Sequence, residues 1–211
     1  MLKADARLKG IYVITDPVLM GDDLVLKTEA AIHAGASIIQ YRNKHATANQ
    51  QLAEARRLRE LCQQNNTVFI INDDPELALA VDADGVHLGQ ADTSLDAARE
   101  RLGNDKIIGV SCNNRFEYAQ QAVTQGADYI AFGRFFPSQT KPHAPQASVD
   151  LLQKAKASWP VPVAAIGGIT PENGKQLIES GATMLAIIHG IFAQQDVHAA
   201  TLDYVQLFAE T

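Results

Sequence analysis

The chain has 211 residues, of which 46% are hydrophobic and 20% are charged. This length suits one domain around one hydrophobic core, so we expect residues 1–211 to form a single domain. The 18 basic and 24 acidic side chains give a formal net charge of −6. That balance excludes a general nucleic-acid or membrane-surface binder, because both require a dominant basic field, but it leaves a local basic pocket open.

Cysteine content and the amino-terminal residues indicate a cytoplasmic protein. Cys62 and Cys112 are too few and too far apart to predict a disulfide framework or a zinc site. Lys3, Asp5 and Arg7 carry charge where a secretion signal requires an apolar run. No stretch reaches the length of uncharged apolar sequence that a membrane-spanning helix needs.

Eight short apolar runs rich in valine and isoleucine are predicted as strands. Each is bounded by Gly, Asp or Asn, and its hydrophobicity is continuous, as in parallel strands that are covered on both faces. In chain order the runs are 11–15, 38–41, 68–72, 85–88, 107–111, 129–133, 163–167 and 184–188.

The stretches between these runs have helical spacing. The apolar residues of 52–62 fall on one stripe, which predicts an amphipathic helix beginning after Thr47. Thr47 and Gln50 are spaced as a capping box. Another helix is predicted after the seventh run, with Thr170 as N-cap and Pro171 at its first position.

A repeated helix-to-strand turn favours a barrel. Gly35, Gly126 and Gly181 each follow a predicted helix and precede an alanine and then a strand, which indicates a repeated unit. Eight strands alternating with helices predict a compact (β/α)8 TIM barrel, with a doubly wound open sheet as the alternative. The barrel is favoured because Asp16 and Pro17 stand where a glycine-rich dinucleotide loop would follow the first strand.

Charged residues at the predicted strand ends suggest an anion and a metal site. Arg42, Lys44 and Lys141 together would suit a polyanion such as a diphosphate, whereas the alternative is a set of solvated rim charges. Asp73 and Asp92 follow neighbouring strands and, beside a diphosphate, would suit Mg²⁺. Helix capping and general acid–base work are the alternatives for these carboxylates.

A second anion site is predicted near the end of the chain. A glycine pair ending at Gly168 follows the seventh strand, and Ile188 and His189 follow the eighth. The loops after these two strands commonly bind phosphate in this type of barrel. The longest connection, 134–147, is predicted to act as a lid or clamp. His87 is interpreted as a strand-end histidine with satisfied hydrogen bonds.

Short motifs run in order along essentially the whole chain. They are YVITD at 12–16, QYRNK at 40–44, ND at 72–73, GVHLGQAD at 85–92, GVS at 109–111, FG with SQTK at 132–133 and 138–141, and IGGIT at 166–170. In this order they resemble the thiamine phosphate synthase family of (β/α)8 barrels. The resemblance implies a transferase that joins 4-amino-5-hydroxymethyl-2-methylpyrimidine diphosphate to 4-methyl-5-(2-phosphooxyethyl)thiazole, giving thiamine phosphate and diphosphate.

The resemblance also implies roles for individual residues. The pyrimidine diphosphate would be bound by Gln40, Tyr41, Arg42, Asn43, Lys44, Asn72, Ser111 and Lys141. The thiazole phosphate would be bound by Ser138, Gln139, Thr140, Gly168, Ile188 and His189. Asp73 and Asp92 would bind Mg²⁺ as the cofactor. The family's chemistry is dissociative, with diphosphate leaving before the thiazole nitrogen attacks, so no protein nucleophile is expected.

Three positions depart from the family's commonest pattern. Asn43 stands where Glu is frequent, Ser138 where Thr is frequent, and His189 where Ser is frequent. Ser138 keeps the hydroxyl, Asn43 leaves the pocket more positive, and His189 retains only the backbone N–H of the usual residue.

Two other functions are alternatives. One is the thiazole tautomerase of the same superfamily, and the other is a non-catalytic barrel that binds phosphorylated metabolites. The diphosphate and Mg²⁺ residues argue against the tautomerase, and they are Arg42, Lys44, Asp73, Asp92 and Lys141. The complete metal site argues against the non-catalytic barrel. The expected partners are the two small-molecule substrates, with no nucleic acid and no membrane, and homo-oligomer formation stays open.

Overall fold

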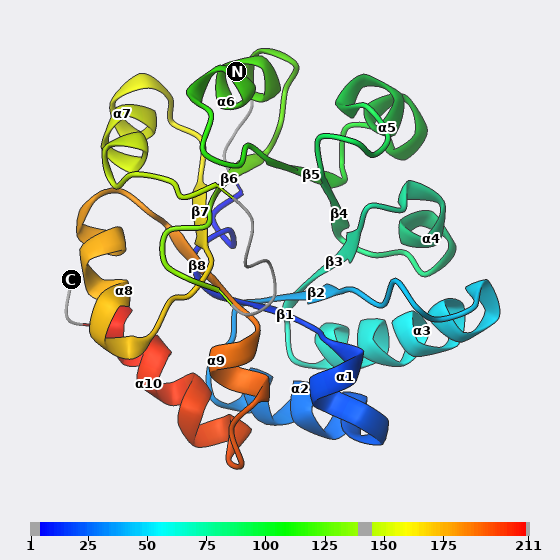
Figure 1. Ribbon diagram of the computed structural model, residues 1–211. Coiled ribbons are helices and arrows are strands. Elements are labelled where there is room, and N and C mark those ends of the chain that lie inside the picture. The colour runs from blue at the N-terminus through cyan, green and yellow to red at the C-terminus, as the bar shows by residue number, and fades with distance from the viewer. Residues whose placement is uncertain (1–4, 139–144, 210–211) are drawn as a thin grey trace.

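The computed structural model describes residues 5–138 and 145–209, and its strands form a closed parallel barrel (Figure 1). The strands are β1 (Gly10–Ile14), β2 (Ile38–Tyr41), β3 (Val68–Asn72), β4 (Gly85–Leu88), β5 (Ile107–Ser111), β6 (Tyr129–Gly133), β7 (Val163–Ile166) and β8 (Met184–Ile187). Each strand pairs with the next, and β8 pairs with β1. The predicted (β/α)8 barrel is therefore confirmed, and the doubly wound alternative is wrong.

Helices surround the barrel on its outer side (Figure 1). They are α1 (Pro17–Met20), α2 (Leu24–His33), α3 (Ala48–Gln64), α4 (Pro75–Ala80), α5 (Leu95–Leu102), α6 (Phe116–Thr124), α7 (Asp150–Ser158), α8 (Pro171–Glu179), α9 (His189–Phe192) and α10 (Val197–Ala209), with a 3-10 turn at Gly21–Asp23. The carboxyl-terminal α10 packs against α8 and α2. Within the two described ranges, every helix is too short or too polar to cross a membrane.

Helix starts follow the predicted capping residues, with one difference. The Thr47 hydroxyl accepts a bond from the Gln50 N–H at 3.3 Å and begins α3. The Gln50 side chain instead donates to Glu54 at 2.9 Å, so the predicted capping box is half formed. A charged acceptor one turn along the helix competes well with a backbone group for this amide. Thr170 and Pro171 begin α8 as predicted.

The strands separate two apolar layers, because successive side chains of a strand point to opposite faces. The layer inside the barrel contains Leu8, Tyr12, Ile14, Ile38, Val68, Ile70, Ile107, Tyr129, Ala131, Ala164, Met184 and Ala186. A larger layer lies between the strands and the helices and includes Ile39, Phe69 and Phe132. Inward positions beyond the inner layer, such as Gln40 and Asn72, therefore face the mouth at the carboxyl ends of the strands.

Gly109 makes room for an aromatic ring inside the barrel. Gly109 on β5 lies in register with Tyr129 on β6, so both positions face the interior. A Cβ at position 109 would lie 1.9 Å from Cζ of Tyr129. The missing side chain is thus what allows the Tyr129 ring to fill this part of the barrel.

We expect Gly109→Ala to lower the free energy of unfolding by about 1–3 kcal/mol, because the Tyr129 ring must shift within a close-packed interior. Urea denaturation followed by circular dichroism measures the change. A midpoint equal to that of the wild type would show that the ring does not pack against position 109.

Candidate active site

A cavity of about 350 Å³ opens among the carboxyl ends of the strands and the loops that follow them. Eight of the predicted site residues line it, namely Gln40, Arg42, Asn72, Ser111, Ser138, Gly168, Ile188 and His189. They come from six different strand ends or the loops after them. The expectation that the polar strand ends share one mouth is therefore met by these residues.

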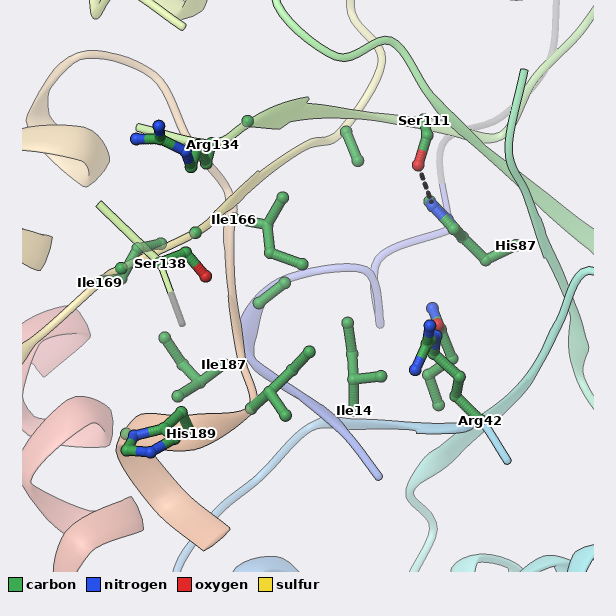
Figure 2. Close-up of a pocket in the computed structure, with 18 of the residues that line it drawn as sticks. Ile14, Arg42, His87, Ser111, Arg134, Ser138, Ile166, Ile169, Ile187 and His189 are labelled. Carbon is green, nitrogen blue, oxygen red and sulfur yellow. Dashed lines mark hydrogen bonds between the residues drawn. The ribbon is translucent and has the colours of Figure 1, made fainter. Parts of the chain in front are cut away.

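The cavity has polar groups at two ends and apolar side chains between them (Figure 2). One end carries Arg42, His87 and Ser111, and the other carries Arg134, Ser138 and His189. Ile14 and Ile166 lie between the two ends, whereas the Ile187 side chain packs in the apolar layer between the strands and the helices. This arrangement suits ligands with apolar ring systems that meet in the middle and charged groups that point outward.

Arg42 is fixed by a buried hydroxyl at the end of the neighbouring strand. The Thr15 Oγ1 accepts a bond from the Arg42 N–H at 2.8 Å and donates to the Arg42 carbonyl at 3.2 Å. Thr15 is only 1% exposed, so these bonds are shielded from water. The backbone at Arg42 is thereby held where its side chain enters the cavity.

Tyr41 and Asn43 are not brought to this cavity. Their side chains lie on the outer face of β2, where the Tyr41 hydroxyl donates to Glu54 Oε2 at 2.7 Å and the Asn43 amide donates to the same oxygen at 3.0 Å. Burial and then the Glu54 carboxylate raise the pKa of Tyr41 well above its ordinary value. Both side chains therefore attach α3 to the end of β2, because alternate residues of a strand face opposite sides.

A second hollow of about 300 Å³ adjoins the mouth between β2 and β3. Lys44 and Asp73 line it, and Lys44 Nζ lies 2.6 Å from Asp73 Oδ2. Asn72 lines both this hollow and the main cavity, so the two spaces meet at the end of β3. Lys44 therefore lines the adjoining hollow and not the main cavity.

Asp73 and Asp92 form a carboxylate pair next to Lys44. Asp92 Oδ2 accepts a bond from the Gly89 N–H at 3.0 Å, and a Cβ at Gly89 would lie 2.5 Å from that oxygen. Partial burial and then the Asp73 carboxylate raise the pKa of Asp92. Burial also disfavours the Asp73 carboxylate, but hydrogen bonds and the charge of Lys44 outweigh it and leave the pKa of Asp73 lowered.

This carboxylate pair fits a divalent cation, which would relieve the repulsion between Asp73 and Asp92. Within residues 5–138 and 145–209, no cluster of three or more His, Cys, Asp or Glu side chains could hold a metal. An ion here would therefore take its other ligands from water or a substrate, which is the coordination that Mg²⁺ prefers.

The opposite end of the cavity depends on contact between two loops. The Phe136 N–H donates to the Gly167 carbonyl at 3.0 Å, which joins the loop after β6 to the loop after β7. Gly168 has a φ of +64°, and a Cβ there would lie 2.3 Å from the Pro137 carbonyl oxygen. Only glycine allows this approach, which places Ser138 beside the cavity. The predicted residues Gln139, Thr140 and Lys141 lie outside the described residues.

Arg134 and His87 are among the cavity residues that were not predicted as site residues. Arg134 follows β6 directly and adds a cation to the end that holds His189. Arg42 was predicted because it comes immediately after a strand, and Arg134 has the same position relative to β6. The same reasoning from the sequence could therefore have identified Arg134. His87 is hydrogen-bonded as interpreted, to Tyr129 and to Ser111, but it also lines the cavity. Its bonds to a distant tyrosine had no sequence signal.

Comparison with known proteins identifies the family. The model of the thiamine monophosphate synthase family matches residues 11–191. The chain is 49% identical over 204 residues to the thiamine-phosphate synthase of Alcanivorax borkumensis, covering 96% of this chain and 94% of that protein. A corresponding enzyme of Marinobacter nauticus is 49% identical over 203 residues, covering 95% of this chain and 91% of that protein.

A solved structure agrees with these relatives. The thiamine phosphate pyrophosphorylase of Pyrococcus furiosus superposes with a TM-score of 0.89 at 33% sequence identity, covering 98% of each chain. Fold, family motifs and overall sequence therefore point the same way. The chain belongs to the thiamine monophosphate synthase family of enzymes.

Proposed function

We propose that this protein makes thiamine phosphate and diphosphate from 4-amino-5-hydroxymethyl-2-methylpyrimidine diphosphate and 4-methyl-5-(2-phosphooxyethyl)thiazole, by a Mg²⁺-assisted dissociative substitution. Family membership supports the overall reaction. The observation that carries the finer proposal is the cluster of Lys44, Asp73 and Asp92 beside a cavity with polar groups at both ends.

The pyrimidine diphosphate would occupy the end of the cavity formed by β2, β3 and β5. Gln40 and Ser111 would contact the pyrimidine, and Arg42, Lys44 and Asn72 the diphosphate. Arg42 offers a planar set of N–H donors, and Lys44 adds a mobile ammonium, so their charges complement phosphate oxygens. Lys141 is assigned to the same group by its place in the family motif.

Asp73 and Asp92 would hold Mg²⁺ next to this diphosphate. When bound, the ion neutralises negative charge that develops on the departing diphosphate. Lys44 already faces Asp73 at 2.6 Å, so a bound diphosphate would give this ammonium a second anionic partner. The carboxylates and the lysine would in this way hold the leaving group from two sides.

The thiazole phosphate would occupy the opposite end, near Ser138, Gly168, Ile188 and His189. Gln139 and Thr140 are assigned here by the family motif, and Arg134 adds a cation. In the reaction, the bond between the pyrimidine methylene carbon and the diphosphate oxygen breaks, and its electron pair leaves with the diphosphate. The thiazole nitrogen then supplies its lone pair to form the new carbon–nitrogen bond.

This chemistry depends on the positioning of the two substrates and the exclusion of water more than on a reactive side chain. Ile14 and Ile166 lie where the two rings would meet, and their apolar surface would keep water from the cationic intermediate. The fixed cations stabilise the charge that separates as the diphosphate leaves. No protein nucleophile is required.

The first test is product formation by the purified protein from the two phosphorylated halves. We expect thiamine phosphate in the presence of Mg²⁺ and its loss when a chelator removes the metal, with recovery when Mg²⁺ is added back. Liquid chromatography of the reaction measures the product. A folded sample that gives no product in either condition would contradict the proposed coupling, and product that survives chelation would contradict the metal assignment.

A substitution at the proposed metal site separates coupling from binding of the thiazole. Asp92→Asn removes one carboxylate of the pair, so we expect kcat to fall by about 100-fold or more. Binding of the thiazole phosphate should stay within about twofold, because that end of the cavity is unchanged. Steady-state kinetics and calorimetry measure the two effects.

Glu117→Gln is the matched control, because Glu117 is an exposed carboxylate on α6 that pairs with the exposed Arg115. Its turnover should equal that of the wild type. Unchanged turnover in Asp92→Asn would overturn the assignment of Asp92 to the metal.

A second substitution tests the thiazole end. Gly168→Ala introduces a Cβ against the Pro137 carbonyl at a positive φ, so the loop that carries Ser138 must move. We expect KM for the thiazole phosphate to rise by about tenfold, with KM for the pyrimidine diphosphate within about twofold. Gly103→Ala is the control, because Gly103 also has a positive φ, but no atom of the described residues lies within 4 Å of the position that its Cβ would take. An equal rise for both substrates would contradict two separate subsites.

A further inference from the structure

A continuous chain of hydrogen bonds lies beneath the cavity and connects two of its lining residues. Gln40 Nε2 donates to the Tyr12 hydroxyl at 2.5 Å, and the Tyr12 and Tyr129 hydroxyls are 2.7 Å apart. The Tyr129 hydroxyl lies 2.8 Å from His87 Nδ1, and His87 Nε2 lies 2.9 Å from Ser111 Oγ. Five different strands, β1, β2, β4, β5 and β6, contribute one residue each.

The middle of this chain is shielded from water. Tyr12 is 1% exposed and Tyr129 is fully buried. Burial raises the pKa of both phenols, so both keep their protons at neutral pH. A buried hydroxyl proton without an acceptor is costly, so each proton in the chain must point along it.

With a neutral imidazole, only two directions place one proton in each of the four contacts and leave neither phenol proton without an acceptor. In one, Gln40 donates to Tyr12, Tyr12 to Tyr129, Tyr129 to His87 Nδ1, and His87 Nε2–H to Ser111. In the other, every donor and acceptor is exchanged, and Gln40 would have to turn its amide oxygen toward Tyr12. The amide nitrogen of Gln40 is the atom that faces Tyr12, which selects the first direction.

We propose that Tyr12, Tyr129 and His87 are positioning residues that form a one-way hydrogen-bond relay, which presents Gln40 to the ligand as an acceptor and Ser111 as a donor. In this direction the amide oxygen of Gln40 is turned away from Tyr12. The Ser111 proton, which His87 does not accept, points to an acceptor in the cavity. The relay therefore fixes the hydrogen-bonding character of two separate groups at once.

The chemical consequence is selection of one edge of a pyrimidine. An amino group beside an unprotonated ring nitrogen offers a donor next to an acceptor, which complements Gln40 and Ser111. An oxo group beside a protonated ring nitrogen offers an acceptor next to a donor. Its oxygen would face the Gln40 oxygen, which is also an acceptor, and its ring N–H would face the Ser111 hydroxyl, which is also a donor. This selection rests on the proposed function, but the direction of the relay itself does not.

Ligand binding tests the selection. The probes are the 4-amino pyrimidine diphosphate and its 4-oxo analogue, each titrated calorimetrically without thiazole. We expect the wild type to prefer the amino compound by about 100-fold or more, since mismatched buried hydrogen bonds are strongly rejected. Tyr129→Phe removes the central hydroxyl and lets both ends adopt either direction, so the preference should fall by about tenfold.

Tyr204→Phe is the matched control. Tyr204 is also buried, and its hydroxyl donates to the Ile169 carbonyl at 3.0 Å, away from the relay. The Tyr204→Phe variant should be less stable than the wild type, like Tyr129→Phe, but it should keep the wild-type preference for the amino compound. If Tyr129→Phe fails to fold, Tyr12→Phe breaks the next bond and should show the same loss. A preference within twofold of the wild type in the relay variant would overturn the selection.

The tautomer of His87 tests the direction without any substrate. Nitrogen NMR of protein labelled at histidine, with the His87 signal identified by its loss in His87→Gln, reports which ring nitrogen carries the proton. We expect a proton on Nε2 and none on Nδ1. A proton on Nδ1 would overturn the relay direction. If the wild type binds neither pyrimidine, the proposed function fails and the selection with it, whereas the tautomer still decides the direction.

Discussion

The site depends on one constraint, the closure of eight parallel strands with side chains that alternate between two faces. Closure brings every carboxyl end to the same rim, and alternation decides which residue of each strand reaches the cavity. On β2, Gln40 and Arg42 line the cavity, whereas Tyr41 and Asn43 hold α3 through Glu54. A contiguous motif therefore splits into binding residues and attachment residues.

The same rim brings the carboxylates of Asp73 and Asp92 together, and local contacts hold each of them in place. Asp73 adopts a φ of +63°, an uncommon conformation for a residue with a side chain, and its N–H donates to the His87 carbonyl at 2.8 Å. Gly89 leaves space for the Asp92 carboxylate, and Lys44 offsets the charge of Asp73. The backbone strain at Asp73 and the repulsion between the two carboxylates therefore occur where the proposed metal would bind. Unfavourable local energies of this kind are common at ligand-binding sites.

The sequence predicted the barrel well, because its strands are buried on both faces and read as continuous apolar runs. The strand limits differ from the predicted ones by one residue at the ends of β1, β7 and β8. Motifs could group residues such as Arg42 and Asp73 but could not resolve which face each residue occupies. Alternation along β2 turns Tyr41 outward, but a run that is apolar on both faces does not show which of its residues face inward. The partners of His87 lie on β5 and β6, and periodicity does not encode contacts between separate strands.

The buried polar chain beneath the cavity is best understood as part of the binding site. Tyr12, Tyr129 and His87 occupy the barrel interior, where apolar side chains would avoid the cost of burying hydroxyl and imidazole groups. Gly109 has no side chain, and this leaves space for the Tyr129 ring. Because a hydrogen-bonded network has a direction and an apolar core does not, these residues can fix how Gln40 and Ser111 meet a ligand. The inner core thus supplies orientation as well as packing.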